Sequence, residues 1–369
     1  MPAELRSLAR RFDLGGVILF ARNVQAPEQV ADLAHDVQQL SRDLPLWVSI
    51  DQEGGRVARL RAPFTEWPPM ATLGRSGDEA LARRFAAALA AELRVVGISL
   101  DYAPVLDVHT NPANSVIGDR ALGRRSDVVA RLGAVIIRTL QGAGVAACGK
   151  HFPGHGDTSA DSHLELPVVE HPPDRLRAVE LEPFRAAIDA EVASIMTAHV
   201  LIPALDDERP ASLSRAIVHD LLRVEMKYGG LIISDDLEMR AVAASSTLEK
   251  AAVAAVAAGC DAVLLCGTDQ DRQVSAIEAI VHAVEAEELS GKAVEESLER
   301  HRRAKTRFAA RGAVHEAAAA GPSSPAQALV ATLGSPLERS WRPPSREQLG
   351  RVLGADEHRR VADLMSQFL

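Results

Sequence analysis

The stretch from Lys150 to His163 concentrates side chains that could do chemistry. Its fourteen residues include three histidines, two aspartates and one lysine, separated by glycine, proline and small hydroxyl residues. The residues before it, 142–148, have the pattern of a turn that runs into a short buried strand. Because catalytic groups are often carried on loops that leave a rigid scaffold, this loop is a candidate functional site.

Two kinds of chemistry are open to this loop. Clustered histidine and aspartate side chains resemble the ligands of a metallohydrolase, although the spacing is not that of a helical pair and the nearest cysteine, Cys148, falls in the apolar run before the loop. Acid–base chemistry is the other possibility, because Asp161 and His163 are two residues apart. At that separation the carboxylate can reach the imidazole, fix its tautomer and raise its pKa. Two solvated polar loop residues are the ordinary alternative.

Two further polar segments follow apolar runs. Asp235 ends one run and is placed to direct its side chain into the mouth of a barrel, whereas Asp236 is expected to cap the next helix. Asp51 follows another run and can accept hydrogen bonds from vicinal hydroxyls, and Arg59 can donate to ring or hydroxyl oxygens. The glycine pair 54–55 allows the backbone to approach a ligand closely.

The elements that position these residues alternate between short apolar runs and helical patterns, which predicts a parallel α/β fold. Polar residues at the carboxyl ends of several runs favour a (β/α)8 TIM-like barrel over a doubly wound open sheet. The sequence supplies no strand before the first run, so the predicted barrel lacks its first N-terminal strand. The runs are Gly15–Phe20, Leu46–Ile50, Ser99–Val108, Val145–Phe152, Ala193–His199, Gly230–Asp235 and Ala262–Cys266.

The carboxyl-terminal part of the chain is expected to be helical. Residues 273–311 have the pattern of one or two helices, and Gly321–Pro325 has the composition of a linker. We therefore predict a catalytic barrel over residues 1–320. Residues 321–369 are predicted to be a linker and tail, either partly disordered or a small helical cap, and they align with no part of the family pattern given below.

Composition narrows the class of protein. The chain has 369 residues, a net charge of −9 and 4% aromatic residues, which disfavours nucleic-acid binding. Three cysteines without a C-x-x-C pair favour reduced, buried thiols. The N-terminus has no signal-peptide core, and no apolar run reaches transmembrane length. We expect a cytoplasmic monomer with no membrane partner.

Several segments together resemble glycoside hydrolase family 3, specifically its bacterial single-domain β-N-acetylglucosaminidases. The matching segments are GGVILFARN, DQEGGRVARL, APVLDV, IGDRALG, GKHFPGHGDTSADSH, MTAHV and SDDLEM, which lie between Gly15 and about Gly267. The resemblance implies that Asp235 is the nucleophile, that His163 is the general acid and base, and that Asp161 is its partner. It also implies sugar ligands, which are Asp51, Arg59, Arg120, Lys150, His151 and His199.

The resemblance implies a retaining exo-β-N-acetylglucosaminidase that acts on non-reducing N-acetylglucosamine of peptidoglycan fragments, with a carbohydrate as its ligand and without a metal or another cofactor. A neutral imidazole in place of the usual second carboxylate adds no negative charge beside Asp235, so the nucleophile stays ionised. Alternatives are a family 3 β-glucosidase or β-xylosidase, a catalytically impaired sugar-binding protein, and a metal-dependent hydrolase. The glycine-rich loop is also expected to move during catalysis.

Overall fold

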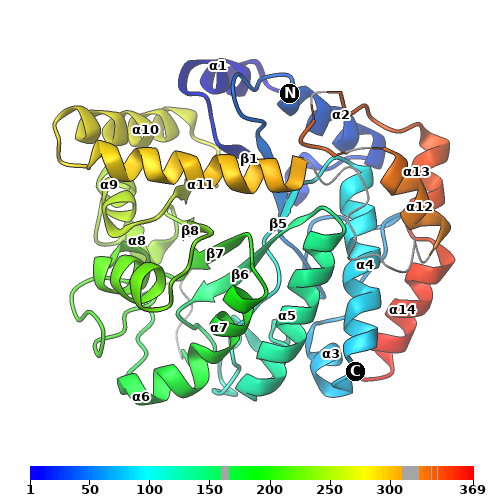
Figure 1. Cartoon of the computed structure of the whole chain (residues 1–369), viewed down its shortest axis with the longest axis horizontal. Coiled ribbons are helices and arrows are strands. Elements are labelled where there is room, and N and C mark those ends of the chain that lie inside the picture. Colours follow the sequence, from blue (N-terminus) through cyan, green and yellow to red (C-terminus); the bar gives the residue numbers. More distant parts are fainter. Residues whose placement is uncertain (159–165, 310–323, 334, 339) are drawn as a thin grey trace. The chain divides into compact units, whose positions relative to one another are not determined.

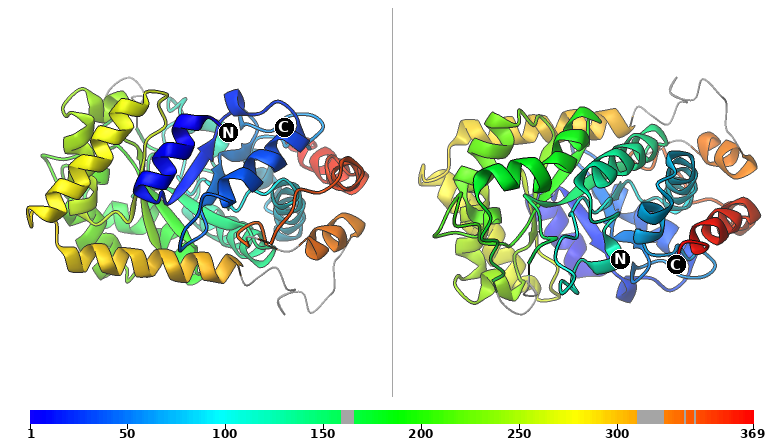
Figure 2. Two further views of the ribbon diagram at one scale, coloured as in Figure 1. Left: turned by 90° about the horizontal axis from the view of Figure 1, so that it is seen from above. Right: turned by 90° about the horizontal axis from the view of Figure 1, so that it is seen from below.

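The computed structural model describes residues 1–158, 166–309, 324–333, 335–338 and 340–369. It divides into two compact units, each assembled from separate stretches of sequence. Unit 1 comprises Met1–Pro104, Arg131–Cys148 and Ala304–Leu369, and unit 2 comprises Val105–Ala130 and Gly149–Arg303. Figures 1 and 2 show the ribbon coloured along the sequence. No helix among the described residues has both the length and the apolar composition needed to cross a membrane.

In the described part of the chain, seven strands form the main sheet in the order β1-β2-β5-β6-β7-β8-β9, and the residues of β6 are divided between unit 1 and unit 2. The pairs β1–β2, β2–β5, β5–β6, β7–β8 and β8–β9 are parallel. A separate antiparallel pair, β3–β4, was not predicted. The strands are β1 (Gly16–Leu19), β2 (Trp47–Ile50), β3 (Gln52–Gly54), β4 (Val57–Ala58), β5 (Leu100–Asp101), β6 (Ala146–Phe152), β7 (Ser194–Thr197), β8 (Leu231–Asp236) and β9 (Ala262–Leu264).

Helices connect the strands of the main sheet, as a parallel arrangement requires. The α-helices of the described residues are α1 (Ala3–Phe12), α2 (Pro27–Gln38), α3 (Ala71–Ser76), α4 (Glu79–Val95), α5 (Ser126–Gly142), α6 (Pro173–Arg175), α7 (Glu182–Asp189), α8 (Arg240–Ala243), α9 (Leu248–Ala258), α10 (Gln270–Glu285), α11 (Gly291–Ala309), α12 (Pro325–Thr332), α13 (Arg346–Val352) and α14 (Asp356–Ser366). The 3-10 helices are η1 (Ala21–Asn23), η2 (Gly118–Arg120) and η4 (Ala211–Leu213), and the π-helices are η3 (Leu176–Glu180) and η5 (Ala216–Glu225).

In unit 1, helix α4 supports the carboxyl-terminal helices. The helix begins where Asp78 Oδ1 accepts hydrogen bonds from the amides of Ala80 and Leu81, as expected of an N-cap. Helices α12, α13 and α14 contact α4, and Figure 1 shows α14 running beside it. The tail therefore forms helices in the described part of residues 324–369. The predicted domain boundary at residue 320 stays a prediction.

A buried glutamate joins α4 to the end of the chain. Glu92 is only 2% exposed, and its carboxylate accepts hydrogen bonds from the amide and hydroxyl of Thr65, at 2.9 and 2.7 Å. It also accepts from the amide of Gly354 at 2.8 Å and lies 3.0 Å from Nδ1 of His358. Burial of a charge is costly unless it is well hydrogen-bonded, and these four contacts offset that cost.

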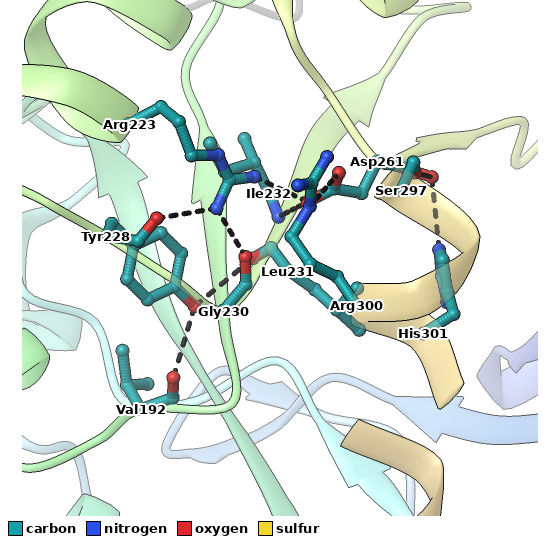
Figure 3. Close-up of polar contacts among 10 residues, drawn as sticks. All are labelled: Val192, Arg223, Tyr228, Gly230, Leu231, Ile232, Asp261, Ser297, Arg300 and His301. Carbon is teal, nitrogen blue, oxygen red and sulfur yellow. Dashed lines mark hydrogen bonds and ion pairs between the residues drawn. The ribbon is translucent and has the colours of Figure 1, made fainter. Parts of the chain in front are cut away.

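In unit 2, Asp261 ties the amino-terminal ends of β8 and β9 to two helices (Figure 3). Its side chain is 1% exposed. Oδ2 accepts hydrogen bonds from Arg223 Nη2 at 2.7 Å and from the amide of Ile232 at 2.8 Å, and Oδ1 accepts from Arg300 Nε at 2.8 Å. Arg223 also donates to the carbonyl oxygens of Tyr228 and Gly230. One carboxylate therefore holds η5, two strands and α11 together.

The predicted parallel α/β fold with a helical carboxyl-terminal part is confirmed. Seven strands are present in the main sheet, as the sequence predicted, and helix α1 occupies the region ahead of β1. Cys148 and Cys260 are buried free thiols, as predicted, whereas Cys266 is partly exposed.

Candidate active site

Unit 2 brings together polar residues from the carboxyl ends of β6, β7 and β8. Lys150 and His151 lie within β6 and are buried, at 2% and 6% exposure. His199 follows β7 and is 1% exposed. Asp235 lies near the end of β8 and is partly exposed. Because carboxyl ends of neighbouring parallel strands meet at one edge of a sheet, four of the predicted site residues lie on one edge of unit 2.

The carboxylate of Asp235 is held in its ionised form. Burial alone would raise the pKa of Asp235, but the neighbouring His199, His151 and Lys150 and the amide of Asp236 outweigh this and lower it below its ordinary value. Its Oδ1 accepts a hydrogen bond from that amide at 2.8 Å. An anionic carboxylate surrounded by cationic or hydrogen-bond-donating groups is what a nucleophile at neutral pH requires.

The next residue, Asp236, does not cap a helix as the sequence suggested. It is the last residue of β8, and α8 begins only at Arg240 after Met239. Asp236 Oδ1 instead accepts hydrogen bonds from the amides of Glu238 and Cys266, both at 3.1 Å. Burial raises the pKa of Asp236 to about 6. Its side chain therefore shapes the turn after β8, because a carboxylate can bond the backbone of a turn instead of a helix.

His199 is held by the protein through both ring nitrogens. Nδ1 lies 2.6 Å from the hydroxyl of Ser212, and Nε2 lies 2.8 Å from the carbonyl oxygen of Asp236. Because a carbonyl oxygen only accepts, Nε2 is protonated and donates a hydrogen bond to the backbone carbonyl of Asp236. His199 therefore fixes the backbone next to Asp235. Its predicted contact with a sugar stays a prediction.

The remaining predicted sugar ligands are distributed between the two units. Arg120 is the last residue of η2 in unit 2, is partly exposed, and donates from Nη1 to the carbonyl of Val116. Asp51 and Arg59 lie in unit 1 on either side of the β3–β4 hairpin, and their side chains form an ion pair at 3.2 Å. Gln52 supports this pair, since its Oε1 accepts a hydrogen bond from the amide of Arg59 at 2.8 Å.

The loop after β6 is braced up to residue 158. Asn114 donates to the carbonyl of His155 at 2.7 Å, and Asp157 contacts both the hydroxyl of Thr110 and Nε2 of His171. A Cβ atom at Gly156 would lie 2.0 Å from the carbonyl oxygen of Val108, so only glycine fits this approach. These contacts of His155 and Asp157 hold the loop in place. The predicted dyad of Asp161 and His163 lies outside the described residues.

Sequence reasoning gave no role to several residues that support the site. Asp107 is fully buried and bonds His151, and a signal for it existed because it is a charged residue that ends an apolar run. Asn114 and His171 had no such signal, since they are isolated polar residues in connecting segments. No group of three or more histidine, cysteine, aspartate or glutamate side chains among the described residues is arranged to hold a metal ion.

The buried ring of His155 should make the free energy of unfolding depend on pH. Burial lowers its pKa from 6.5 to about 4, with a further lowering by His151 that Asp107 opposes. The unfolded chain binds a proton at His155 near pH 6.5, whereas the folded chain binds it only near pH 4. The free energy of unfolding therefore has its full value above pH 6.5 and falls as the pH drops toward 4. The loss is on the order of 3 kcal/mol. Urea denaturation between pH 7 and 4 measures it.

The variant His155→Gln should flatten this dependence, since it removes the titrating ring. His219→Gln is the matched control, because His219 is more exposed and pairs with Asp220 on the surface of η5. Parallel stability curves for the wild type and His155→Gln between pH 6.5 and 4 would contradict the assignment.

Comparison with known proteins identifies the family of the chain. Residues 1–304 match the family described as "Glycosyl hydrolase family 3 N terminal domain". The chain is 43% identical over 259 residues to a β-hexosaminidase of Nitrosomonas eutropha, an alignment that covers 69% of this chain and 74% of that protein.

Solved structures extend the similarity to the whole chain. A family 3 β-N-acetylglucosaminidase from Paenibacillus sp. superposes with a TM-score of 0.85 at 38% identity, covering 100% of this chain and 65% of that one. NagZ from Neisseria gonorrhoeae in complex with N-trifluoroacetyl-D-glucosamine superposes with a TM-score of 0.67 at 33% identity, covering 82% of this chain and 95% of that one. The expectation that the residues past Gly321 have no counterpart in the family was wrong, since the Paenibacillus structure covers them. The chain belongs to glycosyl hydrolase family 3.

Proposed function

We propose that the protein is a retaining exo-β-N-acetylglucosaminidase. The observation that carries the proposal is the carboxylate of Asp235, which is kept ionised at the end of β8 by His199, His151 and Lys150. The names of the β-hexosaminidase and β-N-acetylglucosaminidase relatives support the substrate class. The chain spans 65% of the Paenibacillus chain, so the activity of that longer protein is carried over here only as a proposal.

The proposed reaction has two steps. Asp235 attacks the anomeric carbon while His163 gives its proton to the leaving oxygen, and a covalent glycosyl-enzyme forms as the glycosidic bond breaks. His163, now neutral, then removes a proton from water, which attacks the same carbon and releases Asp235. Two inversions give net retention of configuration. Asp161 would orient His163 in both steps.

In this proposal Lys150, His151 and Arg120 of unit 2 bind the hydroxyl groups of the terminal sugar. Asp51 and Arg59 of unit 1, and His199, are carried over from the family resemblance as further ligands. Peptidoglycan fragments that end in N-acetylglucosamine are the proposed natural substrate, because the resemblance is to enzymes of that kind. The cytoplasmic location and the monomeric state stay predictions.

A set of chromogenic substrates tests the proposed function. We expect rapid release of nitrophenol from N-acetyl-β-D-glucosaminide and far slower release from β-D-glucoside and β-D-xyloside. The first-formed product, followed by proton NMR, should be the β-anomer. Preference for the glucoside or xyloside would transfer the protein to the alternative substrate class, and loss of activity with a chelator would favour the metal-dependent alternative. Binding without turnover would identify an impaired sugar-binding protein.

The natural substrate requires a second comparison. Muropeptides with a non-reducing N-acetylglucosamine should be cleaved with a higher kcat/KM than chitobiose, which presents the same terminal sugar on a different leaving group. Equal values for the two would contradict the peptidoglycan assignment and leave the activity on N-acetylglucosaminides intact.

A further inference from the structure

Asp107 is a carboxylate with no exposed surface, and it contacts β6 at two points and the loop after β6 at a third. Its Oδ2 lies 2.7 Å from Nδ1 of His151. Its Oδ1 accepts hydrogen bonds from the amide of His155 at 2.6 Å and from that of His151 at 3.3 Å. Neither the family resemblance nor the chemistry proposed above gives Asp107 a role.

Asp107 remains a carboxylate in the folded protein. Burial would raise the pKa of Asp107, but the charge and hydrogen bond of His151, together with His155, hold it below its ordinary value. An ionised carboxylate can only accept hydrogen bonds. Nδ1 of His151 therefore carries the proton that lies between the two side chains, whether the ring as a whole is neutral or charged.

The orientation of His151 follows from this contact. With Nδ1 bound to Asp107, Nε2 is the ring nitrogen left to meet a ligand. The ring also packs edge-on against His155, with centroids 6.0 Å apart and planes at 77°. His155 is itself fixed, because its Nδ1 lies 2.7 Å from the hydroxyl of Thr158. A carboxylate and a second ring thus restrain the imidazole that helps to keep Asp235 ionised.

We propose that Asp107 is a positioning residue, which holds His151 in the Nδ1–H tautomer so that Nε2 is presented to a sugar hydroxyl beside Asp235. The proposal rests on the proposed function. Carboxylates that orient ligand-binding histidines in metal sites act in the same way, by fixing the tautomer and the plane of the ring.

The substitution Asp107→Asn separates positioning from simple packing. Asparagine has nearly the same shape, and its Oδ1 can still accept from the amides of His151 and His155. Its amide nitrogen would then face Nδ1 of His151 and donate to it, which forces the proton to Nε2. We expect kcat/KM for the N-acetylglucosaminide to fall by about 10–100-fold, the usual range for loss of such a carboxylate.

Histidine tautomers are read directly from long-range proton–nitrogen NMR spectra of protein labelled with 15N-histidine. The ring signals of His151 are identified by their loss in His151→Gln. The wild type should show a protonated Nδ1, and Asp107→Asn should show a protonated Nε2. The spectrum can be measured without turnover. An inactive wild type would therefore count against the proposed function, whereas the tautomer of His151 would still test the role of Asp107.

Asp206→Asn is a matched control within unit 2. Asp206 Oδ1 accepts from the amides of Glu208 and Arg209, both at 3.0 Å, and its Oδ2 accepts from the hydroxyl of Ser214 at 2.6 Å. It therefore has the same pattern of acceptors without a histidine, and its loss should leave kcat/KM and the His151 signals unchanged. A wild-type ring that is protonated at Nε2 and not at Nδ1 overturns the proposal, as does an unchanged tautomer or an unchanged kcat/KM in Asp107→Asn.

Discussion

Asp235→Asn is expected to lower kcat/KM for an N-acetyl-β-glucosaminide by ~10³-fold or more, because a neutral amide cannot attack the anomeric carbon. The change preserves the shape of the side chain and its acceptor for the amide of Asp236. The midpoint of urea denaturation should therefore change little. Initial rates across substrate concentrations, measured on purified protein at neutral pH, give both kcat and KM.

A smaller side chain at the same position tests the nucleophilic role itself. Asp235→Ala leaves room for azide to attack the sugar in place of the carboxylate. Because one inversion replaces two, the product should be the α-glycosyl azide, whereas the wild type yields the β-sugar. Recovery of a β-azide, or near-normal turnover by Asp235→Asn, would remove Asp235 from the nucleophile's role. Asp206→Asn again serves as the control that should behave as the wild type.

Asp261→Ala is expected to reduce the free energy of unfolding by about 3–5 kcal/mol, the range for breaking a buried ion pair on one side. The variant leaves the guanidinium groups of Arg223 and Arg300, which are 16% and 17% exposed, without the carboxylate they share. It also removes the acceptor of the Ile232 amide at the start of β8 (Figure 3). Urea denaturation followed by circular dichroism measures the loss.

The matched control is Asp220→Ala, which removes an aspartate from the same unit. Asp220 is 62% exposed and pairs with His219 at 2.7 Å. Exposed pairs contribute at most about 1 kcal/mol, so this variant should remain close to the wild type. If both variants lost the same amount of stability, the buried cluster of Asp261, Arg223 and Arg300 would have no special part in holding unit 2 together.

The main elements of the fold could be predicted because their apolar patterns are strong. The run Val145–Phe152 contains β6, and the run Gly230–Asp235 differs from β8 by one residue at each end. The β3–β4 hairpin could not be predicted, since its strands have only three and two residues, too few to show an alternating pattern. The stretch Ser99–Val108 was predicted to contain one strand, and β5 lies within it but includes only Leu100 and Asp101.

The places of the candidate site residues in the fold were easier to predict than the residues with which they form hydrogen bonds. Polar residues at the ends of apolar runs indicated Lys150, His151 and Asp235 correctly as residues near strand ends, and all three lie in unit 2. The bond between Asp107 and His151 joins residues 44 positions apart, and no local pattern specifies such a pair. The misassigned cap at Asp236 has a similar cause, because its side chain turned to the amide of Cys266, 30 residues away.

The contacts of Glu92 also bear on the order in which the chain can fold during synthesis. Unit 1 starts at Met1, but its helix α4 is bonded to Gly354 and His358 through Glu92. All residues of unit 2 have been made once Arg303 is added. Domains fold as units while the chain emerges from the ribosome, so the unit that is begun first can be completed only last. Until Gly354 and His358 have emerged, the carboxylate of Glu92 depends on Thr65 and water for its hydrogen bonds.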